Sequence, residues 1–211
     1  LDVDYLHYGT EYTDEKASPG YYSNHLTKYG ITTEVTATPR SSCERYTFPK
    51  GRGNIILNLG QGLTNECGAM VRRVSTTEVE GMKLMGTFCY TTQAVFPIYF
   101  VLRISHHPSV AGAWKYQPKL QGIEASWMPD DGTYKLYDNY HREIAGDNIG
   151  YYFSFKDLED NEQIVVQMGV SFVSIENARM NLNAEQQDKD FDRIHTEAVA
   201  QWEKDLGRIR I

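Results

Sequence analysis

Apolar and polar side chains alternate along several short stretches of the chain, which is the period of a β-strand with one buried face. Residues 31–38 show this alternation most clearly, and Pro39 ends it. In residues 54–59, apolar side chains occupy both odd and even positions, so we expect a strand there that is covered on both faces. Residues 97–104 predict a central strand, because their proline is tolerated at the start of a strand.

Weaker β patterns extend the expected sheets. They occur at residues 1–6, 45–48, 71–75, 77–82, 151–155 and 164–174. Within the last of these, Gly169 marks a bulge or a close contact. Residues 50–53 and the acidic residues 157–162 are expected to form hairpin turns. Residues 112–148 are more polar, and turn signals interrupt them at 129–132.

The pattern changes to a helical period near the end of the chain. Ser174 is placed to cap a helix through residues 177–182. A second helix is expected from about Asp190 to a stop at Gly207. Its apolar residues fall on one face, namely Phe191, Ile194, Ala198, Val199, Trp202 and Leu206. The predicted fold is therefore mainly β: an antiparallel β-sandwich over residues 1–174, followed by one or two helices over residues 175–211.

Composition narrows the class of function. The 211 residues carry a formal net charge of -7 and a sequence pI of about 5.4. Nucleic acids and anionic membrane surfaces attract basic proteins, so neither is an expected partner. No apolar run approaches the length of a membrane span, since the longest, at residues 96–102, contains a proline and stops at Arg103.

Three cysteines, Cys43, Cys67 and Cys89, are too few for a disulfide framework, and their spacing lacks the CxxC pattern of zinc or thioredoxin sites. One disulfide with one free thiol is an alternative, but we expect three buried thiols.

Several motifs, taken in order, resemble one family. They are residues 15–23 (EKASPGYYS), 29–31 (YGI), 34–38 (EVTAT), 45–49 (RYTFP), 54–59 (NIILNL), 99–101 (YFV) and 169–182 (GVSFVSIENARMNL). Their order and spacing resemble the N-terminal domain of glycoside hydrolase family 92, the bacterial α-mannosidases. Phe191, Asp192 and Trp202 sit where the family's linker has them. Residues 86–96 match loosely, and residues 112–148 show no clear match.

The resemblance implies more than the residues show. It implies a sandwich of the galactose-mutarotase-like (supersandwich) kind, with residues 175–211 as a helical linker to an (α/α)6 catalytic barrel outside this chain. Family members are inverting, calcium-dependent exo-α-mannosidases that act on N-glycans or mannans. Their acid, base and calcium site lie mainly on the barrel, so we expect no catalytic residue, metal or cofactor in this chain. It also implies a periplasmic or cell-surface location, an α-1,2-type specificity, and a sandwich that is incomplete at its N-terminus.

None of the candidate carboxylates lies in a sequence motif that requires a catalytic role. Inverting glycosidases need two carboxyl groups with room for a water between them. Glu124, Glu143, Asp147 and Glu176 are candidates by residue type alone, and Glu176 is better explained by the start of a helix. The adjacent His106 and His107 cannot easily share one metal, so a solvated turn is expected there. The acidic residues 157–162 lack the glycine of an EF-hand loop.

Aromatic side chains give a sharper hypothesis, because a sugar stacks its C–H face on an exposed ring. Phe88 and Tyr90 lie in a loop that is predicted to reach a sugar pocket. Other rings occur among polar residues and are better explained as core or edge-strand cover than as sugar contacts: Trp114, Tyr116, Trp127, Tyr134, Tyr137 and Tyr140. Phe191, Ile194 and Trp202 are predicted to face both the sandwich and the catalytic domain. Without that domain, the exposed apolar surface predicts self-association.

Three functions remain open at this point. The first is an accessory domain that supports the catalytic barrel and shapes its pocket, with no catalysis of its own. The second is a stand-alone carbohydrate-binding module for mannose-containing glycans. The third is a sugar epimerase of the mutarotase kind, which needs its own acid–base pair.

Overall fold

A computed structural model describes residues 1–62, 68–86, 95–118 and 132–208, and these contain thirteen strands and two helices. The strands are β1 (Tyr12–Ser18), β2 (Tyr21–Leu26), β3 (Ile31–Thr38), β4 (Ser41–Phe48), β5 (Gly51–Asn58), β6 (Ala69–Arg73), β7 (Glu78–Gly86), β8 (Val95–Ile104), β9 (Val110–Gln117), β10 (Thr133–Asp138), β11 (Ile144–Gly146), β12 (Ile149–Leu158) and β13 (Glu162–Ser171). The helices are α1 (Ile175–Gln186) and α2 (Phe191–Leu206).

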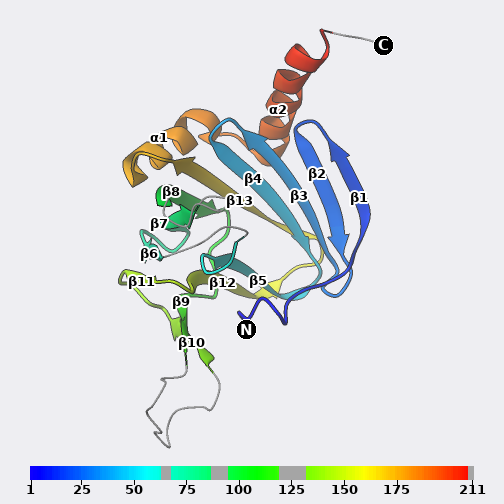
Figure 1. Cartoon of the computed structure of the whole chain (residues 1–211). Helices are drawn as coiled ribbons and strands as arrows, with labels where there is room; N and C mark the ends of the chain where they lie inside the picture. The colour runs from blue at the N-terminus through cyan, green and yellow to red at the C-terminus, as the bar shows by residue number, and fades with distance from the viewer. Residues whose placement is uncertain (63–67, 87–94, 119–131, 209–211) are drawn as a thin grey trace, which may run out of the picture.

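The strands form two facing sheets, and every strand pair is antiparallel (Figure 1). The large sheet has the order β1-β2-β3-β4-β13-β8-β7-β6-β11, and the small sheet has the order β10-β9-β12-β5. Both helices lie on the outer face of the large sheet, on the side away from the small sheet. The predicted antiparallel sandwich with two C-terminal helices is confirmed, and β8 is a central strand as expected.

The main core fills the space between the sheets. Val71, Val79, Phe153 and Ile164 are fully buried there. Side chains alternate between faces, and β5 shows this well: Ile55 and Leu57 pack in the main core, while Ile56 packs on the other side with a second cluster around Trp114. The prediction of cover on both faces is therefore confirmed for residues 55–57, whereas Asn54 is exposed.

Strand β12 departs from the predicted alternation. Its first five residues, Ile149 to Phe153, are all buried. Tyr151 and Phe153 face the main core, while Tyr152 belongs to the second cluster with Trp114 and Val3. A strand in the middle of a doubly covered sheet has no solvent face, so the half-buried pattern expected at residues 151–155 was wrong.

Residues 1–4 have no regular secondary structure and residues 5–7 form a turn, so the expected strand at residues 1–6 is absent. The Asp2 carboxylate accepts a hydrogen bond from the backbone N–H of Asp4 at 2.9 Å, and the Asp4 carboxylate accepts one from the N–H of Leu6 at 3.1 Å. Such local side-chain bonds offer the backbone an alternative to a sheet ladder. Val3 still behaves as a core residue, since it is buried against Trp114 and Tyr152.

Two predicted hairpin turns instead connect the two sheets. Strand β4 lies in the large sheet and β5 in the small one, and the same holds for β13 and β12. The connections lie at residues 49–50 and 159–161, so they overlap the predicted turns only in part, and residues 51–53 belong to β5. A short turn can lead into a hairpin or into a crossing to the facing sheet. The alternation within each strand does not distinguish these outcomes, so the pairing was wrong at residues 50–53 and 157–162.

The helix boundaries follow the predicted caps. The hydroxyl of Ser174 accepts a hydrogen bond from the N–H of Asn177 at 3.1 Å, and Asp190 caps α2 by accepting one from the N–H of Arg193 at 2.9 Å. Gly207 ends α2 as expected. At Gly169 the register of β13 is continuous, and a Cβ there would lie 2.5 Å from the carbonyl oxygen of Ala178. Gly169 therefore permits close packing of α1. Neither helix in the described ranges has the length and apolarity to cross a membrane.

Candidate functional site

The first half of α2 is anchored on the large sheet by apolar side chains. Phe191 and Ile194 are buried, and they pack with the buried Cys43 and the partly buried Tyr21 and Val165. Burial raises the pKa of the Cys43 thiol to about 12, as for an inert core residue. Cys43 is thus a buried thiol as predicted, whereas Cys67 and Cys89 lie outside the described residues.

A charged network surrounds this anchor. The guanidinium of Arg45 lies 4.3 Å from the centre of the Phe191 ring, and it donates to both oxygens of Glu34, at 2.6 and 2.9 Å. It also donates to Asp192 at the start of α2 at 2.9 Å. These hydrogen bonds from Arg45 lower the pKa of Glu34, and the Tyr21 hydroxyl adds another donor at 2.8 Å. The network binds α2 to β3 and β4.

The α1 helix is held by a chain of alternating charges. Arg179 donates to Glu78 and to Glu80 on β7. Arg103 donates to the other oxygen of Glu78 and, at 2.7 Å, to Asn183. Arg72 donates to Glu80 at 2.8 Å. Both glutamates are therefore engaged in fixing a helix.

Glu185 secures the other end of α1. Its carboxylate accepts hydrogen bonds from the side chain of Arg40 at 2.8 Å, from the hydroxyl of Ser41 at 2.9 Å, and from Thr38. Burial opposes ionisation of Glu185, but these donors outweigh it and lower its pKa. The β3–β4 turn is thereby attached to α1.

The second half of α2 leaves the sheet and is exposed (Figure 1). Trp202 is 50% exposed and Leu206 is 53% exposed. Trp202 lies over Gly20, where a Cβ would come within 3.2 Å of its ring. It also lines a cleft of about 230 Å³ with Pro39 and Ala198. Of the three predicted interdomain residues, Phe191 and Ile194 are thus buried against the sandwich, and Trp202 keeps half of its surface free.

A second apolar surface lies where β8 begins and β13 ends. Val95 and Phe96 start β8, and Phe172 and Val173 follow β13. Phe172 and Val173 are 69% and 70% exposed, and the rings of Phe96 and Phe172 are 5.9 Å apart. We call these four residues the end patch. Adjacent exposed apolar side chains of this kind mark an interaction surface more often than single ones do.

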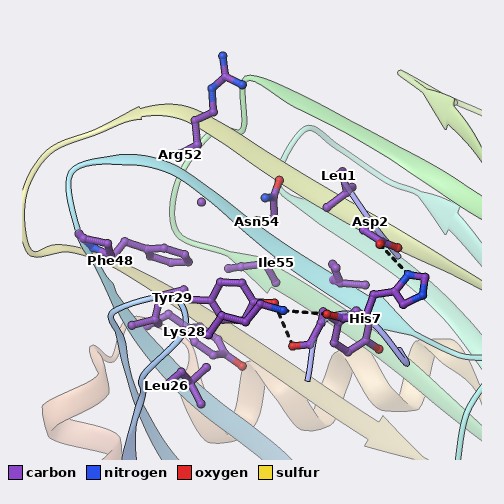
Figure 2. A pocket seen from close by; sticks show the side chains of 16 residues that line it. Leu1, Asp2, His7, Leu26, Lys28, Tyr29, Phe48, Arg52, Asn54 and Ile55 are labelled. Carbon is purple, nitrogen blue, oxygen red and sulfur yellow. Dashed lines mark hydrogen bonds and ion pairs between the residues drawn. The ribbon is translucent and has the colours of Figure 1, made fainter. Parts of the chain in front are cut away.

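A groove of about 520 Å³ lies between β5 and the large sheet (Figure 2). Its walls come from the N-terminal segment, the β2–β3 turn, the end of β4 and residues 52–56 of β5. Apolar side chains such as Ile31, Phe48 and Ile55 line it. Across one end, the Lys28 ammonium donates to the carbonyl of His7 at 2.9 Å. Asp2 is the one carboxylate among the described lining residues, and it contacts His7 at 2.9 Å.

The structure describes some of the other residues that the sequence suggested for sugar, acid–base or metal chemistry, and not others. Phe88, Tyr90, Trp127 and Glu124 lie outside the described residues. Trp114 is fully buried and unavailable to a ligand. His106 and His107 lie in a turn and have different partners, Glu162 at 3.6 Å and Thr76 at 3.0 Å. This supports the predicted solvated turn.

The groove and the charged networks described above do not contain a pair of carboxylates suited to glycoside hydrolysis. The groove has too few carboxylates for a glycosidase pair, and Glu78 and Glu80 are occupied by arginines. Within the described ranges, no three His, Cys, Asp or Glu side chains converge on a point where a metal could bind. These residues do not fit a calcium site. Sequence reasoning missed the groove and the end patch, because each depends on strands that meet only in the folded chain.

Comparisons with known proteins confirm the predicted family. Residues 2–171 match the model of the glycosyl hydrolase family 92 N-terminal domain. A solved family GH92 α-mannosidase from Bacteroides thetaiotaomicron, in complex with mannoimidazole, is similar with a TM-score of 0.70 and 24% identity, over 94% of this chain and 24% of that chain. No curated protein matches the chain.

Two further solved structures are similar. A family GH92 inverting mannosidase from Bacteroides thetaiotaomicron has a TM-score of 0.73 and 24% identity, over 95% of this chain and 24% of that chain. A GH92 family glycosyl hydrolase has a TM-score of 0.75 and 26% identity, over 96% of this chain and 26% of that chain. This chain therefore spans about a quarter of the length of the solved structures it matches.

Proposed function

This chain belongs to the glycosyl hydrolase family 92 N-terminal domains, and we propose that it is the accessory sandwich of an exo-acting α-mannosidase whose chemistry takes place on another domain. The observation that carries the proposal is the family match over residues 2–171, combined with solved mannosidases that are about four times as long. The groove and the glutamates that hold α1 support an accessory role, because the groove has one carboxylate and Glu78 and Glu80 are hydrogen-bonded to arginines.

The domain's task is to present surfaces to a catalytic (α/α)6 domain. Two exposed apolar surfaces suit that role: the end patch, and the free half of α2 with Trp202 and Leu206. Val95 and Phe96 of the end patch directly follow residues 87–94, which contain the predicted sugar-contacting Phe88 and Tyr90. We expect the patch to pack on the catalytic domain and to position these residues at the sugar.

The finer details of the activity are part of the same proposal. We expect an inverting, calcium-dependent enzyme with α-1,2-type specificity for mannose in N-glycans or mannans, located in the periplasm or at the cell surface. Its calcium ligands and both catalytic carboxylates are expected on the catalytic domain, since the described residues here do not form a suitable set.

An activity assay tests the proposal. The 211-residue chain and the longer polypeptide that contains it are each incubated with an aryl α-mannoside, with calcium or with a chelator. We expect turnover by the longer polypeptide only, lost on chelation. Turnover by the 211-residue chain would overturn the assignment of chemistry to another domain and favour an independent glycosidase.

A binding assay separates an accessory domain from a stand-alone carbohydrate-binding module. Mannose oligosaccharides are titrated into the 211-residue chain and followed by calorimetry. We expect no binding tighter than about millimolar, because part of a pocket holds a sugar poorly. Micromolar binding would favour the module.

A further inference from the structure

Strand β10 ends the small sheet, and its outer edge has no neighbouring strand among the described residues (Figure 1). It pairs with β9 along its whole length, from Thr133 to Asp138, without a register shift. A regular edge of this kind presents a row of unpaired N–H and C=O groups, which another strand can use.

Two hydrogen bonds at the ends of β9 fix the direction of these groups. The N–H of Asn139, which follows β10, donates to the carbonyl of Ala111 at 2.8 Å, and the N–H of Tyr116 donates to the carbonyl of Asn148 at 2.9 Å. Because the bonding direction alternates along a strand, odd-numbered residues of β9 bond to β10 and even-numbered residues bond to β12. The odd-numbered residues of β10 pair with odd-numbered residues of β9, so their N–H and C=O groups are used within the sheet.

The even-numbered residues of β10 direct their backbone groups to the free edge. They are Tyr134, Leu136 and Asp138. Among the described residues, no backbone hydrogen bond outside the β9–β10 ladder involves any of the three. Their N–H and C=O groups are therefore open to a strand from outside.

The other sheet edges are protected against such pairing. Strand β1 has a register shift between Thr13 and Lys16, and Asp14 adopts a positive φ of 55°. Bulges of this kind blunt an edge strand. Strand β11 has three residues, and the edge of β5 borders the groove, whose walls include the N-terminal segment and the β2–β3 turn. The β10 edge has neither a bulge nor a covering segment among the described residues.

A second copy of β10 can pair with this edge in few antiparallel registers. The edge-directed groups of the two strands must meet, so even-numbered residues must lie opposite even-numbered residues. In a two-fold arrangement, one residue then lies opposite itself at the axis. The positions near the middle of the strand that can take this place are 135, 136 and 137.

The side chains select the register centred on Leu136. A register centred on Lys135 would place two ammonium groups directly opposite one another, and like charges in that position are destabilising. A register centred on Tyr137 would bring Asn139 into the pairing, but Asn139 has a φ of 55°, outside the strand region. When Leu136 lies at the axis, residues 134–138 pair throughout, and the two Leu136 side chains meet.

This register also gives the charged side chains suitable neighbours. Lys135 lies opposite Tyr137 of the second copy, and within one chain the Lys135 ammonium already lies 5.3 Å from the centre of the Tyr137 ring. Asp138 lies opposite Tyr134 of the second copy, so no like charges meet. The β10 edge is therefore complementary to itself.

We propose that β10 is a self-association surface, at which two copies of this chain pair their β10 strands antiparallel about Leu136. The two four-stranded sheets then join into one continuous sheet. One strand pair makes a small interface, so we expect a weak dimer with a dissociation constant on the order of 0.1 mM. This association does not depend on where the mannosidase chemistry takes place.

Hydrogen exchange of single amides at two protein concentrations tests the pairing. At about ten times the dissociation constant, about one fifth of the chains remain monomeric, so the amides of Tyr134 and Leu136 should exchange about fivefold slower than in dilute solution. The amides of Lys135 and Tyr137 are bonded to β9 and should be slow at both concentrations. The same dependence is expected in the longer polypeptide. Rates for Tyr134 and Leu136 that do not change with concentration, in either polypeptide, would overturn the proposal.

Charge substitutions at position 136 test the register. Leu136→Lys and Leu136→Asp each place like charges opposite one another at the axis, so each variant alone should be monomeric in sedimentation equilibrium. An equal mixture of the two variants should form dimers again, because opposite charges then meet. This recovery requires position 136 to lie opposite itself. If both variants are folded by circular dichroism and their mixture stays monomeric, the proposed pairing is wrong.

The exposed end of α2 supplies a control for association through a different surface. Leu206→Ser alters a side chain that is 53% exposed and distant in sequence from β10, and it should leave the dissociation constant unchanged. If Leu206→Ser abolishes the dimer while Leu136→Lys leaves it intact, the chains associate through α2 and the assignment to β10 fails.

Discussion

Helices α1 and α2 cover the same face of the large sheet, but they are held on it by different forces. Charged side chains hold α1 near its middle through Arg179 and near its C-terminal end through Glu185, and only a few apolar residues such as Leu182 lie beneath it. Apolar burial of Phe191 and Ile194, together with the hydrogen bond from Arg45 to Asp192, holds α2, and only in its first half. The second half of α2 is exposed at Trp202 and Leu206.

This difference assigns the two helices different roles. A helix attached at its middle and at its C-terminal end is part of the sandwich. A helix fixed at one end has a direction set by the sandwich and a free face for another surface. We therefore interpret α1 as a structural part of this domain, and α2 as the element that sets the position of whatever packs on its exposed half.

Removal of the Phe191 ring tests the anchor of α2 and should give the largest effect. Phe191→Ala is expected to lower the free energy of unfolding by about 3–5 kcal/mol, because it empties a buried site. Urea unfolding measures the loss, and hydrogen exchange should show α2 opening while α1 stays protected. Ile194→Val is the milder control, at about 0.5–1.5 kcal/mol. Equal loss of protection in α1 and α2 would show that the helices are not held independently.

The charged attachment of α1 is expected to be weaker and distributed. Arg179→Met removes the central cation, but Glu78 keeps Arg103 and Glu80 keeps Arg72. We expect a loss of about 1–3 kcal/mol in urea unfolding, since the glutamates retain partners. Arg179→Lys should restore less than half of that loss, because an ammonium cannot bridge two carboxylates as a planar guanidinium does. Full restoration by lysine would mean that charge alone holds α1.

Sequence reasoning identified α2 more completely than α1. The apolar stripe from Phe191 to Ala198 has a helical period, so the helix and its buried face were both predictable. The partners of Arg179 lie about one hundred residues earlier on β7, and no local pattern connects them. The cap at Ser174 and the close contact at Gly169 were predictable, because each depends on a single residue's chemistry.

The candidate site was less predictable than the fold, for a similar reason. Strands β4 and β5 follow one another across a short turn but lie in different sheets, and the groove exists only because of that crossing. Period-two alternation reports which side chains share a face, but it does not report which strand lies alongside or opposite. The expected hairpins and the missed groove have this one cause.

The pH dependence of stability sharpens the comparison at the α2 anchor. The hydrogen bonds from Arg45 lower the pKa of Glu34 below its ordinary value of 4.5. The ionised Glu34 therefore stabilises the folded chain fully at pH values above 4.5, and this stabilisation is lost as the pH falls through the lowered pKa. Glu34→Gln should cost about 1–2 kcal/mol at pH 7, as expected for hydrogen bonds to a charged group. The gap between the two proteins in urea unfolding should shrink below pH 4.5. A gap that stays constant down to pH 3 would show that the carboxylate's charge contributes nothing.

The smallest effect is expected at the free end of α2. Leu206→Ser changes a side chain that is 53% exposed in the last turn, so the unfolding free energy of the 211-residue chain should change by no more than about 0.5 kcal/mol. In the longer polypeptide the same change should cost clearly more, because we expect this half of α2 to contact the catalytic domain there. A large effect in the 211-residue chain would mean that both halves of α2 are anchored on the sandwich, and the distinction between the two helices would then fail. A negligible effect in both polypeptides would instead place the interdomain contact elsewhere, with the end patch as the next surface to alter.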